Sequence, residues 1–453
     1  MTLKTRLTAL SGPTDGPLGR RAAATNMAAQ SSALVLAAVA SVVVARTSGA
    51  AVLGDWTLLR ILPWLTAVIV SCGLPVASAY VLSTPTGDSP RTRGTLAALL
   101  VAGTAAGMLV WLVLTPLLGA RLLDSVPNGL LLLMAVTVGT QLWTTWAKAC
   151  CQGWADIPGA NLIIVAEELA FLPVFVLALL ADVDAIVAMA VALIAGGLCS
   201  TTIALLRLRR IRFLRGWGRP DVRLARSVAA YGARAQLGNL LWLVNLRLDV
   251  LMLGAMAGPE VLGVYAVASK SAELMRLPAN AANYVLYPRF ARMGSGEASA
   301  EVRTLLPRAG ALTVLATPVL AAGSVVALPA VFGPAFQDAV APACVLLLGL
   351  AVEGAAAVST AYLCGRGRPG ANSLGMGLGV LVTVVLDLAL IPRFGALGAA
   401  AASSAAYLAT TFLLVLLAVR LSGRHQSTVL RPAPAFSRRS HELRNDRLHR
   451  GGS

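Results

Sequence analysis

Apolar segments long enough to cross a lipid bilayer follow one another along nearly the whole chain. A membrane-spanning helix needs about 20 consecutive, mainly apolar residues, and the 453-residue sequence contains twelve such segments. Charged residues make up 13% of the chain, whereas soluble proteins average about 25%. The sequence therefore predicts an all-α polytopic membrane protein with about twelve spans. The predicted spans are 27–46, 56–82, 95–119, 128–152, 159–180, 184–206, 228–255, 260–287, 309–330, 336–363, 370–391 and 394–420.

The spans fall into two sets of six, separated by a basic connection. The predicted organisation is an N-terminal segment 1–26, a bundle 27–206, a linker 207–227, a bundle 228–420 and a disordered basic tail 421–453. Two related halves are common among transporters. A short repeat supports such a relationship weakly, because Val-Leu-Gly occurs at 52–54, just before the second span, and at 261–263, at the start of the eighth.

The distribution of basic residues predicts the orientation. When residues near a span end are assigned to the adjoining side, 29 of the 37 lysines and arginines lie on the same side as the N-terminus. Four lie on the other side (Arg46, Arg60, Arg121 and Arg393) and four lie within spans (Arg234, Arg247, Lys270 and Arg276). Because cytoplasmic loops of membrane proteins are enriched in these residues, both termini are predicted to be cytoplasmic. The same rule accounts for the net charge of +17 without a nucleic-acid partner.

Several ionisable residues are predicted to lie at bilayer depth, where they usually face protein or a watery cavity. The seventh and eighth spans each carry a polar stripe at helical spacing, and Lys270 can pair with Glu273 at i, i+3. We expect a central cavity, lined by the first, second, seventh and eighth spans, whose positive field attracts an anionic head group. The alternative is that these residues pair with one another and fix helix packing. The candidate cavity residues are Arg60, Arg234, Asn245, Arg247, Asp249, Lys270, Glu273, Arg276 and Asn280.

Acidic residues within the spans are candidates for coupling transport to an ion. Glu273, Glu353 and Asp387 are the positions proposed, and the sequence does not distinguish H⁺ from Na⁺. Glu353 and Asp387 stand alone in their spans, so packing is an equally good interpretation for both.

The sequence motifs of common catalytic sites are missing from the chain. No Gly-Lys-Ser/Thr, HExxH, GxSxG or CxxC sequence is present, and the three histidines lie in the tail. The sequence therefore predicts no metal and no cofactor. Asp182 and Asp184 have the DxD spacing of some metal-dependent glycosyltransferases, but their place in a short connection favours a simple turn.

Three stretches carry a resemblance to a known family. They are the run from Tyr231-Gly232 through Asn245–Gly254 to Leu262–Ala268, the segment Val331–Phe336, and the pair 365–368 and 391–400. In their order and spacing they resemble the polysaccharide flippases of O-antigen and teichoic-acid type, within the multidrug/oligosaccharidyl-lipid/polysaccharide (MOP) superfamily. The resemblance covers roughly residues 20–420 and is more specific in the second half.

The resemblance implies two six-helix bundles that face each other across a central cavity, as in MATE transporters. It implies alternating access in the bacterial cytoplasmic membrane and an undecaprenyl-pyrophosphate-linked oligosaccharide as substrate. Arg247 and Asp249 match the family's Arg-x-Asp, either as functional residues or as a structural pair. Twelve spans differ from the fourteen usual in the lipid II flippase branch. Membrane lipids and the machinery of polysaccharide polymerisation are the expected partners.

Three other functions stay open at this stage. A multidrug or organic-cation antiporter of the same superfamily would need an acidic cavity, whereas the candidate residues are more basic than acidic. A membrane glycosyltransferase or polymerase is disfavoured by the short external loops. An interaction protein that acts through its basic tail is the fourth hypothesis. The sequence thus favours a transporter over an enzyme.

Overall fold

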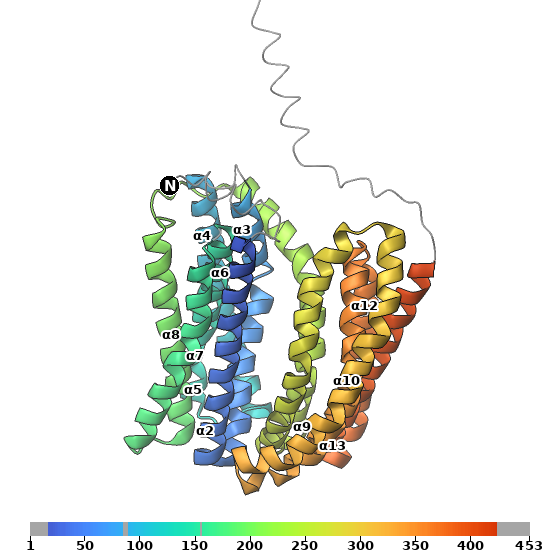
Figure 1. Ribbon diagram of the computed structural model, residues 1–453. Helices are drawn as coiled ribbons and strands as arrows, with labels where there is room; N and C mark the ends of the chain where they lie inside the picture. The colour runs from blue at the N-terminus through green and yellow to red at the C-terminus, as the bar shows by residue number, and fades with distance from the viewer. Residues whose placement is uncertain (1–16, 85–88, 155, 424–453) are drawn as a thin grey trace, which may run out of the picture.

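The computed structural model of the chain describes residues 17–84, 89–154 and 156–423, and every regular element within these ranges is a helix (Figure 1). The first half contains α2 (Pro17–Val70), α3 (Leu74–Ser83), α4 (Pro90–Arg121), α5 (Asn128–Leu133), α6 (Ala135–Gly153), α7 (Ile157–Leu180) and α8 (Ala185–Arg210). The second half contains α9 (Val222–Arg292), α10 (Ser295–Phe332), the 3-10 helix η1 (Pro334–Ala339), α11 (Val340–Leu350), α12 (Glu353–Gly365) and α13 (Pro369–Gly423).

The three longest helices, α2, α9 and α13, are each a hairpin of two helices. Each is interrupted by one glycine with non-helical backbone angles: Gly49, Gly258 or Gly395. In a straight helix, residues 249 and 265 would lie about 24 Å apart, yet the Tyr265 hydroxyl donates a hydrogen bond to the Asp249 carboxylate. The other two hairpins also bring distant residues together. In α2, Leu34 and Arg60 line the same cavity, and in α13 the side chain of Leu414 packs against Gly375.

The hairpins bring the number of membrane crossings to twelve. In the part of the chain that the structure describes, eight helices are long and apolar enough to span a membrane, and a pair bent by 43°, Pro334–Leu350 with Glu353–Gly365, makes a ninth. Three of these nine turn back at a glycine and cross twice. The predicted fold class and number of spans are therefore confirmed.

Several boundaries differ from those predicted. Helix α2 begins at Pro17 rather than residue 27, and the connection between the halves runs only from the end of α8 at Arg210 to the start of α9 at Val222. The second span is broken at 71–73 and the tenth at 351–352. The predicted N-terminal segment up to residue 16, and the tail from residue 424, lie outside the described residues.

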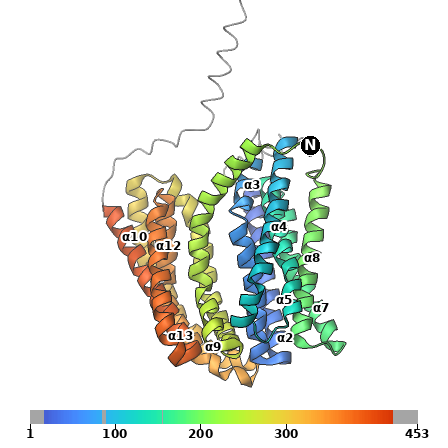
Figure 2. The ribbon, with the colours of Figure 1, turned by 180° about the vertical axis from the view of Figure 1, so that it is seen from behind.

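The helices form two groups joined by α9. Figures 1 and 2 show α2 to α8 in one group and α10 to α13 in the other. The start of α9 lies beside α3 and α4, and the helix then runs down to the second group. The two groups approach each other at the end where α2, α9 and α13 turn, and they diverge toward the N-terminal end. We call these the turn end and the N-terminal end.

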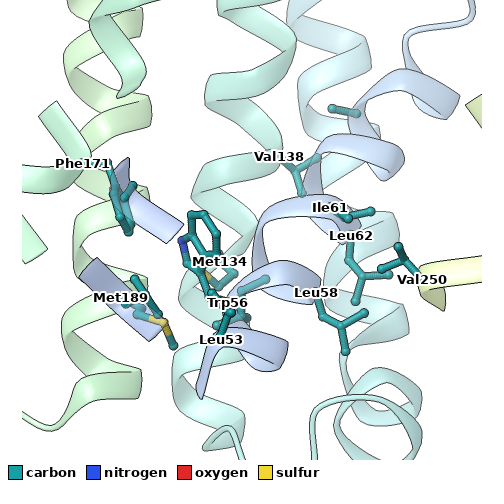
Figure 3. Packing of buried hydrophobic residues seen from close by; sticks show 14 of the residues in the cluster. Leu53, Trp56, Leu58, Ile61, Leu62, Met134, Val138, Phe171, Met189 and Val250 are labelled. Carbon is teal, nitrogen blue, oxygen red and sulfur yellow. The ribbon is translucent and has the colours of Figure 1, made fainter. Parts of the chain in front are cut away.

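The first half packs around large side chains of α2. Trp56 lies 5.8 Å from Phe171 between ring centroids, and both side chains are buried. Figure 3 shows these residues with Met134 and Met189, and shows Val250 of α9 pointing toward α2. Because lipid tails are as apolar as leucine, such helices are held by close van der Waals packing rather than by the hydrophobic effect.

Backbone contacts between α2 and α9 close the turn end. Gly49 and Gly258 have nearly the same backbone angles, with φ of 81° and 82°, a region that glycine adopts without strain. Five residues after each turn, Gly54 and Gly263 meet the opposite hairpin. A Cβ atom on Gly54 would lie 1.9 Å from the carbonyl oxygen of Pro259, and one on Gly263 would lie 1.9 Å from that of Ala50.

This reciprocal contact, which we call the clasp, explains the repeated Val-Leu-Gly of the sequence. The third position of the repeat must be glycine in both halves, because two backbones meet there. A further contact lies between the halves, where the Arg46 guanidinium donates to the carbonyl oxygens of Ala330 and Val331, with 2.7 Å from Nε to the latter. The clasp thus relates the two halves by an approximate two-fold symmetry.

Candidate functional site

Two adjoining cavities lie between the helices of the two halves. The first-half cavity, of about 380 Å³, is lined mainly by α2, α6, α7 and α9. The second-half cavity, of about 360 Å³, is lined mainly by α9, α11, α12 and α13. The predicted first, second, seventh and eighth spans all contribute. Five residues line both cavities: Leu34, Arg247, Val250, Ser269 and Glu273.

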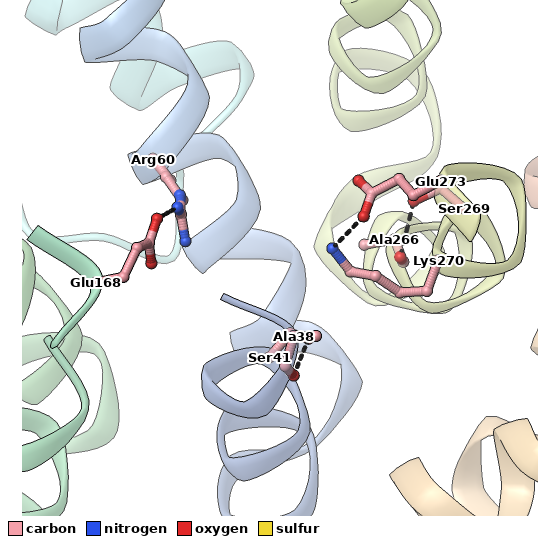
Figure 4. Close-up of polar contacts among 8 residues, drawn as sticks. All are labelled: Ala38, Ser41, Arg60, Glu168, Ala266, Ser269, Lys270 and Glu273. Carbon is pink, nitrogen blue, oxygen red and sulfur yellow. Dashed lines mark hydrogen bonds and ion pairs between the residues drawn. The ribbon is translucent and has the colours of Figure 1, made fainter. Parts of the chain in front are cut away.

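The cations of the first-half cavity are mostly neutralised by carboxylates. The Arg60 guanidinium forms an ion pair with Glu168 and lies 5.4 Å from the ring of Trp56. Lys270 pairs with Glu273 at 3.2 Å, which confirms the i, i+3 pairing expected from the sequence. Figure 4 shows the two ion pairs on opposite sides of the space between α2 and α9.

Glu167 is a cavity residue that the sequence analysis missed. Its carboxylate accepts a hydrogen bond of 2.5 Å from the Gln141 side chain, and it lies close enough to Lys148 for an electrostatic interaction. Gln141 and Lys148 share one face of the fourth span, so a search for acids facing that stripe would have found Glu167.

The second-half cavity holds Arg276 against an aromatic ring. The guanidinium lies 4.7 Å from the centroid of Tyr407, and Glu353 is its acidic neighbour. Asn280 lines the same cavity. Tyr407 was not predicted, although Ser403, Tyr407, Thr410 and Thr411 recur at helical spacing along the last span and form a stripe that marks this face.

Arg247 and Asp249 do not pair with each other. Asp249 is buried and accepts hydrogen bonds from the hydroxyls of Tyr265 and Ser403, the latter at 3.2 Å. Arg247 has no ion pair or side-chain hydrogen bond within the described residues, and its Nε atom is buried. It also lies close enough to Arg60 for the two like charges to interact. The interpretation of Arg-x-Asp as a structural pair is therefore wrong for this chain.

Two candidate cavity residues are not found in either cavity. Arg234 is exposed on α9 and lines neither of them, because this part of the helix lies nearer the N-terminal end. The side chain of Asn245 lies outside the described residues. The other candidates, Arg60, Arg247, Asp249, Lys270, Glu273, Arg276 and Asn280, all line a cavity.

The charges lining the two cavities are balanced. Among the described residues, five cations (Arg60, Lys148, Arg247, Lys270 and Arg276) face five acids (Glu167, Glu168, Asp249, Glu273 and Glu353). The positive excess expected from the sequence is thus absent, because the fifth span contributes two acids. The positive charge that remains available is local, because Arg247 keeps unpaired donors at the junction of the cavities.

Asp387 lines neither of the two cavities. It is fully buried, and neither carboxylate oxygen has a hydrogen-bond partner within the described residues. Its acidic neighbour is Asp249. Burial without a partner disfavours the charged form of a carboxylate. Such a group therefore tends to bind a proton or a cation.

The described residues contain no group of three or more histidine, cysteine, aspartate or glutamate side chains placed to hold a metal ion. The DxD sequence is a turn between α7 and α8. Asp182 has a φ of 56°, and the Asp184 carboxylate caps α8 by accepting from the backbone N–H groups of Ile186 and Val187 at 2.9 and 3.3 Å.

Replacing Asp184 by asparagine should leave the protein stable and active. Asparagine caps helices as well as aspartate does, whereas Asp184→Ala should lower the stability by about 0.5–2 kcal/mol through loss of the cap. Thermal unfolding in detergent would measure this difference. Loss of activity in the stable asparagine variant would instead indicate a metal-binding role.

The comparisons with known proteins agree with this architecture. The family model described as polysaccharide biosynthesis protein matches residues 20–294, more than half of the chain. No curated protein matches the sequence.

Among solved structures, the chain is similar to lipid II flippase MurJ in an inward closed conformation, with a TM-score of 0.69 and 13% identity over 87% of each chain. It is also similar to an inward-facing multidrug resistance MATE family transporter of the MOP superfamily, with a TM-score of 0.67 and 14% identity over 87% of this chain and 95% of that one. A Vibrio cholerae MATE transporter, VcmN, is similar with a TM-score of 0.62 and 14% identity, over 90% of this chain and 97% of that one.

These identities are low, so the solved structures establish the fold alone. The family match extends from the start of α2 to the end of α9 and includes Arg60, Arg247 and the clasp. The resemblance seen in the sequence is therefore confirmed: the chain belongs to the polysaccharide biosynthesis protein family and has the fold of the MOP superfamily.

Proposed function

We propose that this chain flips an undecaprenyl-pyrophosphate-linked oligosaccharide across the bacterial cytoplasmic membrane, for the synthesis of a surface polysaccharide. The observation that carries the proposal is Arg247, a guanidinium that has unpaired donors within the described residues and lies where two polar cavities meet. A guanidinium binds phosphate oxygens through two parallel hydrogen bonds. Membership of a polysaccharide biosynthesis family supports the same class of substrate.

The second-half cavity offers the groups that bind sugars. Amides and hydroxyls line it, and these side chains both donate and accept hydrogen bonds, as sugar hydroxyls require. With the pyrophosphate at Arg247, the first sugars would lie in this cavity. The lining amide and hydroxyl residues are Tyr265, Ser269, Asn280, Asn283, Thr360, Asn372, Tyr407, Thr410 and Thr411.

The position of the clasp supports alternating access. The excess of lysine and arginine supports an orientation with the N-terminal end in the cytoplasm and the turn end outside. With the clasp closed, the substrate would enter from the cytoplasmic side. Separation of Gly54 from Pro259, and of Gly263 from Ala50, would then open the cavities outward.

The test is the location of lipid-linked oligosaccharide in a strain that lacks this protein. A membrane-impermeant lectin should bind the intermediate in wild-type cells, whereas in the deletion strain the intermediate should accumulate out of reach of the lectin. Normal surface polysaccharide with no trapped intermediate would contradict the proposal. The polymerase and glycosyltransferases that act on the same intermediate would be the partners.

An ion gradient is the proposed source of energy, with Asp387 rather than Glu273 as the coupling group. Glu273 already pairs with Lys270, and Glu353 lies beside Arg276, whereas Asp387 has no partner within the described residues. The three acids were equivalent candidates in the sequence. Their surroundings now favour Asp387 for binding H⁺ or Na⁺ beside Asp249.

Replacing Asp387 by asparagine should remove the dependence of flipping on the ion gradient. Asparagine keeps the shape of the side chain but binds neither a proton nor Na⁺, and a coupling free energy of 1–3 kcal/mol corresponds to about 5–150-fold in rate or affinity. Flipping would be measured in proteoliposomes under imposed H⁺ or Na⁺ gradients. Asp338→Asn, an exposed acid in η1, is the control. Full gradient dependence in the Asp387 variant would exclude it as the coupling group.

An organic-cation antiporter stays the second candidate because the cavity charges are balanced. Its acids could accept a cation if one of the ion pairs opened. Drug susceptibility that rises on deletion, with normal surface polysaccharide, would favour it over the flippase.

A further inference from the structure

Three arginines form a row on the exposed face of α9. Arg223, Arg226 and Arg234 lie within about 80° of one another around the helix, because each residue adds about 100°. All three side chains are exposed, and none forms an ion pair or a side-chain hydrogen bond within the described residues. Arg223 and Arg226 lie in the first two turns of α9, which begins at Val222, and Arg234 lies about 12 Å farther along the axis than Arg226.

This part of α9 is attached along one side only. A Cβ atom on Gly73 would lie 2.1 Å from the Gly232 carbonyl oxygen, so the two backbones touch. Tyr231 stacks on Tyr80 of α3 at 4.6 Å between ring centroids, and the Gln236 amide donates to the Val68 carbonyl at 3.1 Å. The residues between these contacts are exposed, including Ala233 and Ala235. The helix is therefore held firmly while its arginine face stays open.

An unpaired arginine exposed within a spanning helix is unfavourable in hydrocarbon. Such residues face water or bind an anion. Among the described residues, Arg234 has no carboxylate partner to lower this cost, unlike Arg60, Lys148, Lys270 and Arg276, which each have an acid beside them. Arg247, whose Nε atom is buried without a hydrogen-bond partner among the described residues, lies about 20 Å farther along α9 and about 140° around the helix from Arg234. The three exposed arginines thus extend from the start of α9 toward the depth at which Arg247 lines both cavities.

We propose that Arg223, Arg226 and Arg234 form an entry track that captures the diphosphate head group of a lipid at the N-terminal end and passes it to Arg247. The inference rests on the proposed function for the direction in which the lipid moves, but the binding of a diphosphate by arginines does not depend on it. A row of like charges attracts anions over a distance of about a Debye length and raises their rate of association. The track acts before the cavity is reached and so governs capture rather than the crossing step.

The experiment compares two variants that remove the same charge. The track variant carries Arg223→Gln, Arg226→Gln and Arg234→Gln. The control carries Arg209→Gln, Arg210→Gln and Arg219→Gln, three exposed arginines outside α9. The probe is fluorescent undecaprenyl diphosphate, which has no sugars, in neutral liposomes with the full-length protein. Binding is measured at low and high ionic strength.

The track variant should bind the probe at least about tenfold more weakly at low salt, and lose most of its salt dependence, because three attractive charges are gone. In flipping assays its KM should rise while kcat is retained. The control should behave as wild type in both assays. Equal losses in the two variants would overturn the proposal, as would full displacement of the probe by equimolar phosphatidylglycerol, which would identify a surface for bulk anionic lipid.

The single substitution Arg234→Gln provides a second readout if the triple variant folds poorly. It should weaken probe binding while Arg219→Gln does not, and unchanged binding would also overturn the track. This outcome can be distinguished from a failure of the proposed function. If the track bound the diphosphate lipid but the protein moved no glycan, the entry track would stand and the flippase function would be refuted.

Discussion

Replacing Gly54 or Gly263 by alanine should hold the two halves apart at the turn end. The new methyl carbon would be placed 1.9 Å from a carbonyl oxygen of the other hairpin, whereas carbon and oxygen atoms approach to about 3.3–3.6 Å even in weak hydrogen bonds. Neither atom belongs to a flexible side chain, so the backbones must separate by more than an ångström. The conformation with the clasp closed would be destabilised in both variants.

The expected size follows from the cost of overpacking. Inserting one carbon into a close-packed contact costs about 1–3 kcal/mol, which corresponds to about 5–150-fold in a two-state equilibrium. Spin labels at Ala51 and Glu260, exposed positions beside the clasp, would measure the separation of the halves in a variant without native cysteines. The distance between them should lengthen in either glycine variant, and flipping should fall by a similar factor.

Gly103 provides the matched control. It lies in α4, and a Cβ atom there would meet no atom within 4 Å. Gly103→Ala should therefore leave both the label distance and flipping unchanged. If the Gly54 and Gly263 variants behaved in the same way as this control, the clasp would not be a gate.

Replacing Arg247 by glutamine should remove most of the flipping activity without unfolding the protein. Hydrogen bonds to charged groups contribute about 1.5–3 kcal/mol, so the affinity for the diphosphate should fall by about 10–150-fold. The fold should persist because Arg247 has no protein partner within the described residues. Removal of a like charge near Arg60 should raise the thermal stability.

Lysine at position 247 should retain part of the activity, because it keeps the charge but not the two-pronged geometry of the guanidinium. Arg121→Gln, an exposed arginine at the end of α4, is the control and should retain both binding and flipping. Binding of undecaprenyl diphosphate and thermal unfolding in detergent would be measured together. A glutamine variant that lost stability rather than binding would show that Arg247 is structural after all.

The sequence predicted the fold well because its signal is strong and local. Each span is an apolar run of sufficient length, and the positions of the basic connections follow from charge alone. The broken second and tenth spans were not predicted, since a helix interrupted by one or two residues keeps its apolar pattern. The start of α2 at Pro17 was missed for the opposite reason, because that end of the helix is polar.

The site was predicted in part. Helical spacing placed seven of the nine candidate residues at a cavity, but it could not say which charges meet, since partners such as Arg60 and Glu168 are 108 residues apart. For the same reason Arg247 and Asp249, close in sequence, were considered a pair, whereas Asp249 bonds to Tyr265 and Ser403. Arg234 shared a stripe with cavity residues, yet it lies on the exposed length of α9.

The sequence by itself determined the membrane class, the twelve crossings and the family, since these depend on composition, on segment length and on motifs read along the chain. Only the tertiary structure decided how the charges are paired, why glycine recurs at positions 54 and 263, and which cavity arginine keeps unpaired donors among the described residues. The physical reason is distance. Ion pairs and backbone contacts form over a few ångströms between helices that are far apart in sequence, and hydropathy contains no information about which helix faces which.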